Sequence, residues 1–303
     1  MDYTESHVPD QTGKVFFVTG ANTGIGFETA RVLAEKNGRV LLGCRSRNNA
    51  EEALSHIRTL KPNANITWVP LDLASLRSIA HAADIVRLES RLDGLINNAG
   101  VMMPPRTETE DGFELQFGVN HLGHFALTGH LLRLLIGTKD ARIVTVSSLA
   151  HRRGEIDYGD IDARETYDRM ARYQMSKFAN MLFVLELQRR LTLIGSSVLS
   201  VACHPGVAAT ELGRHTILST IFHWLRPLFN SPLEGAQPTL MAATDKNVQG
   251  GDYFGPKGVF ELRHSARRVD VIERARNQDD AARLWEISEK MTRVRYDFRP
   301  SIA

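Results

Sequence analysis

Short apolar runs alternate with longer segments of helical period along most of the chain, and this alternation limits the fold more than any other feature. Seven runs rich in β-branched and aliphatic residues are candidate strands, at 14–19, 39–44, 65–70, 93–98, 142–147, 198–203 and 251–254. Candidate helices lie at 24–36, 48–60, 75–90, 111–136, 171–194 and 233–244. Buried strands separated by helices predict a parallel sheet covered on both faces. We therefore predict a doubly wound, mainly parallel seven-stranded α/β sheet in a single domain spanning 1–303.

Two segments depart from the alternation. After the sixth strand, 216–229 carries many large apolar side chains but is too short to span a bilayer. We expect a variable insertion at about 211–232 that covers a lipophilic substrate, packs as core, forms a subunit interface or touches a membrane surface. Near the end of the chain, arginines interleaved with acidic residues indicate a solvated helical extension at about 265–295.

The charges of the chain nearly cancel, which argues against functions that depend on a large net charge. The sequence has 37 Lys and Arg residues against 35 Asp and Glu residues. We therefore expect no nucleic-acid partner. The N-terminus lacks the basic start and apolar run of a secretory signal, and Cys44 and Cys203 are expected to be buried free thiols. These features predict a cytoplasmic protein without a transmembrane segment.

The first candidate strand runs into a glycine-rich turn, TGANTGIG, which opens the first candidate helix. Glycine permits a tight turn and lets backbone amides approach a pyrophosphate at the positive end of a helix. The glycine spacing of four and then two differs from the general GxGxxG fingerprint. We predict a dinucleotide site made by Gly20, Asn22, Thr23, Gly24, Ile25 and Gly26.

The end of the second candidate strand indicates which dinucleotide is bound. An acidic side chain at this point binds the ribose hydroxyls of NAD(H) and repels a 2′-phosphate. Here the sequence is CRSRN, which puts Arg45 at that position and Arg47 close behind it. A guanidinium pairs well with a phosphate, so we expect NADP(H) rather than NAD(H).

Tyr173 and Lys177 lie four residues apart in a segment of helical period, so their side chains share one face of the helix. A free phenol titrates near pH ~10, and a cation beside it favours the phenolate. The pair therefore suits proton transfer. Tyr253 and Lys257 have the same spacing, but Pro256 lies between them and argues against a helix there.

His121 and His124 lie three residues apart on a candidate helix, a spacing that can place two imidazoles on one metal. No third ligand is evident in the sequence. We predict core or surface roles for both histidines and no catalytic metal.

An ordered set of motifs identifies the family that the chain resembles. The set is TGANTGIG, NNAG at 97–100, VNHLGHF at 119–125, VSS at 146–148, Tyr173 with Lys177, and HPG at 204–206. It resembles the short-chain dehydrogenase/reductase family, and within it the branch of retinol-dehydrogenase-like and protochlorophyllide-reductase-like enzymes. The resemblance covers roughly 14–258 and implies a Rossmann fold.

The resemblance also implies catalytic roles. Tyr173 is expected to be the general acid/base, and Lys177 to lower its pKa and hold the nicotinamide ribose. Ser148 is expected to hydrogen-bond the substrate oxygen, and Asn120 to fix a water that links Lys177 to solvent. Ser148 and Tyr173 are 25 positions apart, more than in compact family members, which leaves Ser147 as an alternative donor.

Further dinucleotide contacts follow from the resemblance, and all of them come after strand ends, where doubly wound sheets bind ligands. They are Asp72 and Leu73 at the adenine, Asn98, Ala99 and Gly100 along its ribose, and Pro205, Gly206, Val207 and Thr210 at the carboxamide and phosphates.

Taken together, these features predict an NADP(H)-dependent oxidoreductase that interconverts a carbonyl and an alcohol on a lipophilic small molecule. Family resemblance adds the expectation of a homo-oligomer. The motifs leave open a dinucleotide-binding sensor or scaffold without catalysis, and a double-bond reductase of the protochlorophyllide-reductase type.

Overall fold

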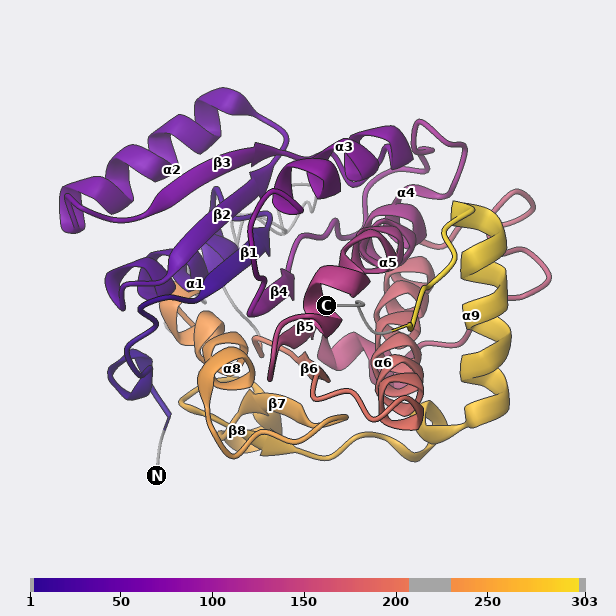
Figure 1. The fold of residues 1–303 in the computed structure, drawn as a ribbon. Helices are drawn as coiled ribbons and strands as arrows, with labels where there is room; N and C mark the ends of the chain where they lie inside the picture. The colour runs from indigo at the N-terminus through magenta and orange to yellow at the C-terminus, as the bar shows by residue number, and fades with distance from the viewer. Residues whose placement is uncertain (1–2, 207–229, 300–303) are drawn as a thin grey trace.

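The structure, a computed structural model, describes residues 3–206 and 230–299 and contains an eight-stranded sheet with the order β3-β2-β1-β4-β5-β6-β7-β8 (Figure 1). Neighbouring strands from β3 to β7 are parallel. The mainly parallel, doubly wound prediction is therefore confirmed. The strands are β1 Val15–Thr19, β2 Arg39–Cys44, β3 Ile66–Pro70, β4 Gly94–Asn97, β5 Arg142–Val146, β6 Leu199–Cys203, β7 Tyr253–Pro256 and β8 Ala266–Val269.

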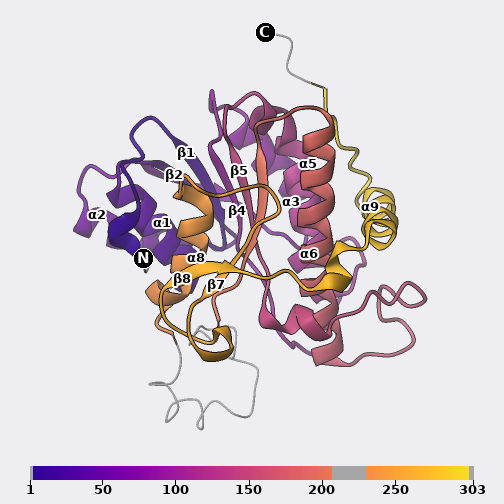
Figure 2. The same cartoon turned by 90° about the horizontal axis from the view of Figure 1, so that it is seen from below.

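Helices cover both faces of the sheet, which explains why the central strands are mostly apolar (Figure 2). Successive residues of β1 point to opposite sides: Phe16 and Val18 pack with α1, α2 and α8, whereas Val15 and Phe17 pack with α3, α5 and α6. The helices are α1 Gly24–Glu35, α2 Arg47–Leu60, α3 Leu76–Val86, α4 Leu115–Phe117, α5 Gly123–Ile136, α6 Arg169–Leu193, α8 Pro232–Thr244 and α9 Gln278–Thr292.

The sheet has eight strands, so the prediction of seven strands was wrong. The eighth strand also occupies the start of the segment at 265–295 that we expected to be helical. β8 is antiparallel to β7 at the edge of the sheet, and Ala266 also bridges to Tyr3. Its two central residues, Arg267 and Arg268, are exposed, and such charges are common on edge strands. In the sequence, these arginines fit a solvated helix as well as an edge strand, so the sequence alone did not indicate this short strand.

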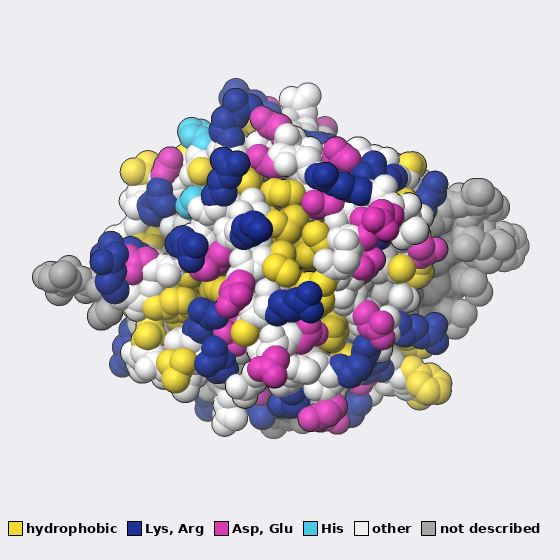
Figure 3. All heavy atoms as spheres, turned by 90° about the vertical axis from the view of Figure 1, so that its right-hand side faces the viewer, with side chains coloured by type: hydrophobic (Ala, Val, Ile, Leu, Met, Phe, Trp, Pro, Cys, Tyr) yellow, Lys and Arg dark blue, Asp and Glu magenta, His cyan; other side chains and the backbone are white. Residues whose placement is uncertain are grey.

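The helical part of the extension is α9, which lies outside α6 (Figure 2). Ala281, Leu284 and Trp285 of α9 are buried, whereas Arg283 and Glu286 are exposed. On this side of the molecule, acidic and basic side chains are interspersed (Figure 3). The solvated face that the sequence predicted is therefore present on this helix.

The long helical segment expected at 111–136 is interrupted by one turn of π-helix. Gly118–Leu122 forms this turn, between α4 and α5, and carries Asn120. Single π-helical turns occur often at functional sites because they alter the register of the side chains that follow.

Within residues 3–206 and 230–299, the structure contains no helix with both the length and the apolar character needed to cross a bilayer. The apolar run at 216–229 lies outside the described residues, as does most of the insertion expected at 211–232.

Candidate active site

The glycine-rich turn joins β1 to α1 at the carboxyl edge of the sheet. Gly20 has φ +65° and Gly24 has φ +57°, conformations that other residues rarely adopt. A Cβ on Gly26 would lie 2.3 Å from the carbonyl oxygen of Gly20, so this position has no room for a side chain. The turn therefore brings its backbone against the first turn of α1.

The N-terminus of α1 is open to an anion. α2, α3, α6, α8 and α9 each begin on a residue whose side chain accepts a hydrogen bond from the first turn. Thr23, which precedes α1, makes no such bond, and its side chain is exposed. Asn22 precedes Thr23, and Ile25 in the first turn of the helix is buried. Backbone amides at such a helix end suit a pyrophosphate.

Thr19, the last residue of β1, ties the turn after β4 to the glycine-rich turn, a role that sequence reasoning missed. Its hydroxyl oxygen accepts hydrogen bonds from the backbone amides of Asn98 (2.9 Å) and Ala99 (3.0 Å). The Asn98 side-chain amide donates to the Thr19 carbonyl (2.8 Å). The sequence hints at this role only in that a threonine ends an otherwise apolar strand.

Arg45 lies at the end of β2 with its side chain 79% exposed and its guanidinium 3.8 Å from the Asp72 carboxylate. Arg47 instead pairs with Glu51 of its own helix at 2.8 Å. Asp72 also accepts a hydrogen bond from the Ala74 amide (2.9 Å), which holds the carboxylate at the end of β3. The structure thus brings Arg45 and Asp72 together and directs Arg47 along α2. Leu73, the next residue after Asp72, is buried at the same strand end.

The structure brings Tyr173, Lys177 and Ser148 together. Tyr173 and Lys177 both lie on α6, and the Lys177 ammonium is 5.8 Å from the centre of the Tyr173 ring. Ser148 follows β5, and its side chain forms a hydrogen bond with Tyr173. Ser147 instead donates to the Lys177 carbonyl (2.9 Å) and is buried. Of the two serines, Ser148 is therefore the one that faces the phenol.

Burial and hydrogen bonding oppose each other at Tyr173. Burial raises the pKa of Tyr173, and the hydrogen bond with Ser148 lowers it in part. Burial also lowers the pKa of Lys177 to about 8, and its ammonium donates to the Val146 carbonyl (3.1 Å). The pKa of Tyr173 is therefore raised, in the direction opposite to the lowering that we expected from Lys177.

Asn120 holds the segment after β4 beside Lys177. Its side-chain oxygen accepts from the Val101 amide (2.8 Å), and its side-chain nitrogen donates to the Val101 carbonyl (2.9 Å). A Cβ on Gly100 would lie 3.1 Å from the Asn120 oxygen and 3.5 Å from the Lys177 nitrogen. Gly100, Asn120 and Lys177 therefore lie close together.

Pro205 and Gly206 follow β6 and are held by polar contacts. The Gly206 amide donates to Nδ1 of His204 (3.2 Å), and Nε2 of His204 lies 3.0 Å from the Glu261 carboxylate. The Asn230 amide donates to the Pro205 carbonyl (2.9 Å). Sequence reasoning gave no roles to His204, Glu261 or Asn230, because their partners are distant in the sequence.

Two predicted dinucleotide contacts, Val207 and Thr210, lie outside the described residues. Of the insertion expected at 211–232, the structure describes 230–232. Ser231 is the N-cap of α8, and its hydroxyl accepts from the Glu234 amide at 3.2 Å.

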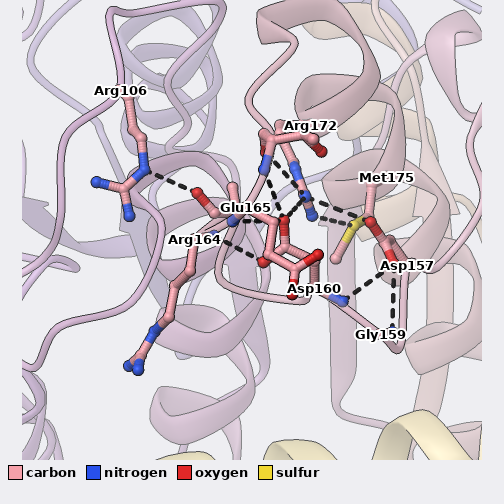
Figure 4. A network of polar contacts seen from close by, with 10 residues as sticks. Arg106, Asp157, Gly159, Asp160, Arg164, Glu165, Arg172 and Met175 are labelled. Atoms are coloured by element: carbon pink, nitrogen blue, oxygen red, sulfur yellow. Dashed lines mark hydrogen bonds and ion pairs between the residues drawn. The ribbon is translucent and has the colours of Figure 1, made fainter.

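The long loop between Ser148 and Tyr173 is anchored to α6 through Arg172 (Figure 4). The buried Arg172 guanidinium lies 3.2 Å from the Asp160 carboxylate and 3.4 Å from that of Asp157. Asp160 also accepts from the backbone amides of Arg164, Glu165 and Thr166, at 2.6, 3.1 and 3.0 Å. The loop is therefore attached to α6 one residue before Tyr173.

A second loop joins this anchor. Arg106, from the segment after β4, donates to the Ala163 carbonyl at 2.8 Å (Figure 4). The Tyr167 hydroxyl donates to the Pro104 carbonyl at 2.9 Å. Two chain segments on the same side of the site are therefore linked to each other as well as to α6.

The family model for short chain dehydrogenases matches residues 14–218, which span the glycine-rich turn, Asn120, Ser148, Tyr173 and Lys177. The chain belongs to the short-chain dehydrogenase/reductase family. Members of this family bind a nicotinamide dinucleotide, and the donor set at α1 suits the pyrophosphate of such a cofactor.

Among named proteins, the chain is similar to retinol dehydrogenases. It is 42% identical to mouse retinol dehydrogenase 14, over 93% of this chain and 86% of the relative. It is 45% identical to human retinol dehydrogenase 13, over 92% of this chain and 84% of the relative. It is 42% identical to human retinol dehydrogenase 12, over 94% of this chain and 88% of the relative. The chain is therefore a retinol-dehydrogenase-like member of the family.

Solved structures share the fold. A crystal structure of an uncharacterized protein from Mycobacterium paratuberculosis has a TM-score of 0.83 and 37% identity, covering 98% of this chain and 100% of that chain. A short chain dehydrogenase from Shigella flexneri, solved with NADP, has a TM-score of 0.66 and 23% identity, covering 80% and 97%. At 23% identity, the likeness to the Shigella flexneri protein shows the fold alone.

Proposed function

We propose that the protein is an NADP(H)-dependent oxidoreductase that interconverts a carbonyl and an alcohol on a lipophilic small molecule. The observation that carries the proposal is the meeting of Ser148, Tyr173 and Lys177 at the carboxyl edge of the sheet, where the glycine-rich turn also ends. The retinol dehydrogenase relatives support a lipophilic substrate.

The residues act by proton transfer and orientation. In reduction, the Tyr173 hydroxyl gives its proton to the substrate oxygen while Ser148 donates a hydrogen bond to the same oxygen; in oxidation the proton returns to Tyr173. The side chains of Ser148 and Tyr173 are neighbours, so a substrate oxygen bound beside them can contact both hydroxyls. The bound dinucleotide supplies or accepts the hydride.

Lys177 stabilises the phenolate that forms when the proton leaves Tyr173. Its pKa of about 8 leaves it mainly protonated at neutral pH. The nearby positive charge is therefore present when the phenol ionises, and it favours the phenolate against the burial that raises the pKa of Tyr173.

The preference for NADP(H) rests on Arg45. Its exposed guanidinium lies at the end of β2 with a single weak ion pair to Asp72, and the distance of 3.8 Å leaves it free to turn to a phosphate. Asp72 stands at the end of β3 rather than β2, so the position after β2 carries a positive charge.

A Tyr173→Phe variant tests the proposal. We expect turnover to fall by at least about a hundredfold, because general acid/base catalysis contributes about 10²- to 10⁴-fold. Turnover is followed by NADPH absorbance with a panel of lipophilic aldehydes and ketones that includes retinal. Dinucleotide binding, measured by NADPH fluorescence, should change little.

The matched control is Tyr158→Phe, which removes a phenol that bonds to Asp280 of α9. It should retain turnover. Full activity of Tyr173→Phe would show that another group moves the proton.

A further inference from the structure

His121 lies in the π-helical turn and His124 in the first turn of α5, and both are buried, yet they bond to different parts of the molecule. Nε2 of His121 lies 2.9 Å from the Ser288 hydroxyl of α9. Nε2 of His124 lies 2.9 Å from the Thr19 hydroxyl, and its Nδ1 lies 3.1 Å from the Asn120 carbonyl oxygen. His124 thus connects the end of β1 to the π-helical turn beside Lys177.

The partners of His124 determine which ring nitrogen carries the proton. A carbonyl oxygen can only accept, so Nδ1 must donate to Asn120. Nε2 of the neutral ring must then accept, and the Thr19 hydroxyl donates to it. The Thr19 oxygen keeps its lone pairs for the amides of Asn98 and Ala99. Every bond in this network then has one donor and one acceptor.

The alternative partner of the Thr19 hydroxyl is weaker. The Ile96 carbonyl lies 3.3 Å from the hydroxyl oxygen, compared with 2.9 Å for Nε2 of His124. Burial lowers the pKa of His124 to about 4, and the nearby charge of Lys177 contributes to the shift. The ring is therefore neutral above about pH 5, as the network requires.

We propose that His124 is a positioning residue that, as the Nδ1–H tautomer, fixes the Asn98–Gly100 turn and the Asn120 carbonyl relative to each other. The inference rests on the proposed function, because both elements flank Lys177 and the predicted ribose contacts. His124 touches neither Tyr173 nor Ser148 directly in its hydrogen bonds and acts on the reaction through Thr19 and Asn120.

The tautomer can be measured without any turnover. In wild-type protein labelled with 15N-histidine, we expect one ring whose Nδ1 carries the proton at pH 6 to 8, and whose signals vanish in His124→Gln. His121→Gln provides the second assignment. A neutral His124 ring protonated at Nε2, or a ring that titrates between pH 6 and 8, would overturn the proposal.

A double-mutant cycle tests the connection to the site. Thr19→Val and His124→Phe should each lower the affinity for NADPH and kcat/KM by about tenfold, the size expected for a lost buried hydrogen bond. Because both substitutions break one network, the double variant should be little worse than the poorer single variant. If the loss of affinity in the double variant equals the product of the losses in the two single variants, Thr19 and His124 act independently.

Two controls separate positioning from folding. Thr19→Ser keeps the hydroxyl and should restore most of the affinity and of kcat/KM. His121→Phe removes a buried imidazole from the same helix and should lower the melting temperature without lowering dinucleotide affinity. If the wild-type protein turns over no substrate of the panel, the proposed function fails, whereas the tautomer and the affinity cycle still decide the role of His124.

Discussion

Desolvation dominates the electrostatics of single residues in the candidate site. Tyr173 and Lys177 are both buried, and burial favours the neutral form of each side chain. It raises the pKa of Tyr173 and lowers the pKa of Lys177. The hydrogen bond from Ser148 counters this at Tyr173. The spacing of Tyr173 and Lys177 was readable from the sequence, but the degree of burial depends on chain segments far from α6.

Lys177 should make stability depend on pH. Its pKa falls from 10.5 to about 8 on folding, so between these values the unfolded chain binds more protons and stability rises with pH. The free energy of unfolding of the wild type should therefore gain up to about 3 kcal/mol relative to Lys177→Met between pH 7 and pH 10. Urea unfolding of both proteins at several pH values measures this difference. A constant difference would mean that Lys177 is not desolvated.

Arg45 should control the choice of dinucleotide. Arg45→Asp places a carboxylate where it can bind ribose hydroxyls and repel a 2′-phosphate, so preference should move from NADPH toward NADH by about tenfold or more. The measured quantity is the ratio of kcat/KM values for the two dinucleotides. Arg47→Asp is the control, because Arg47 pairs with Glu51, and it should change the ratio much less. An unaltered NADPH preference in Arg45→Asp would contradict this assignment.

At the scale of elements, the Asp160 carboxylate is a main anchor of the loop between Ser148 and Tyr173. Asp160 joins the Arg172 side chain to three backbone amides of the loop, and Arg106 joins the same loop to the segment after β4 (Figure 4). This anchor lies next to Tyr173, so loop order and substrate binding should be connected.

Asp160→Ala should therefore loosen the loop and leave Arg172 buried with a weaker partner. We expect a lower midpoint of urea unfolding, a higher KM for bulky carbonyl substrates and faster proteolysis within 157–166. Asp157→Ala is the matched control, because its carboxylate is more exposed (49% against 11%) and lies farther from Arg172. Equal effects of the two substitutions would show that Asp160 has no special role.

At the scale of the whole molecule, the sheet was largely predictable because runs such as VFFVT and RIVTV are largely buried on both faces and mostly apolar. β8 was not predicted, because Arg267 and Arg268 conceal a short antiparallel edge strand. The π-helical turn at Asn120 was also missed, since apolar periodicity does not show a local change in hydrogen-bond register.

The site was predictable to the extent that its groups lie in short motifs. Tyr173 with Lys177 and the glycine-rich turn could be read directly. The contact between Thr19 and His124 joins residues 105 positions apart, and that between His204 and Glu261 joins residues 57 apart. Such pairings depend on strand order, which a single sequence shows only in outline.

The most direct test of the proposed function is to follow the transferred hydrogen. The protein is incubated with NADPH carrying deuterium at the transferable position of the nicotinamide and with a carbonyl substrate from the panel, and the product is analysed by mass spectrometry and NMR. The proposed function predicts an alcohol with one deuterium on the former carbonyl carbon, formed by the wild type and not by Tyr173→Phe. Deuterium on a carbon of a reduced double bond, or no labelled product with any substrate, would contradict it.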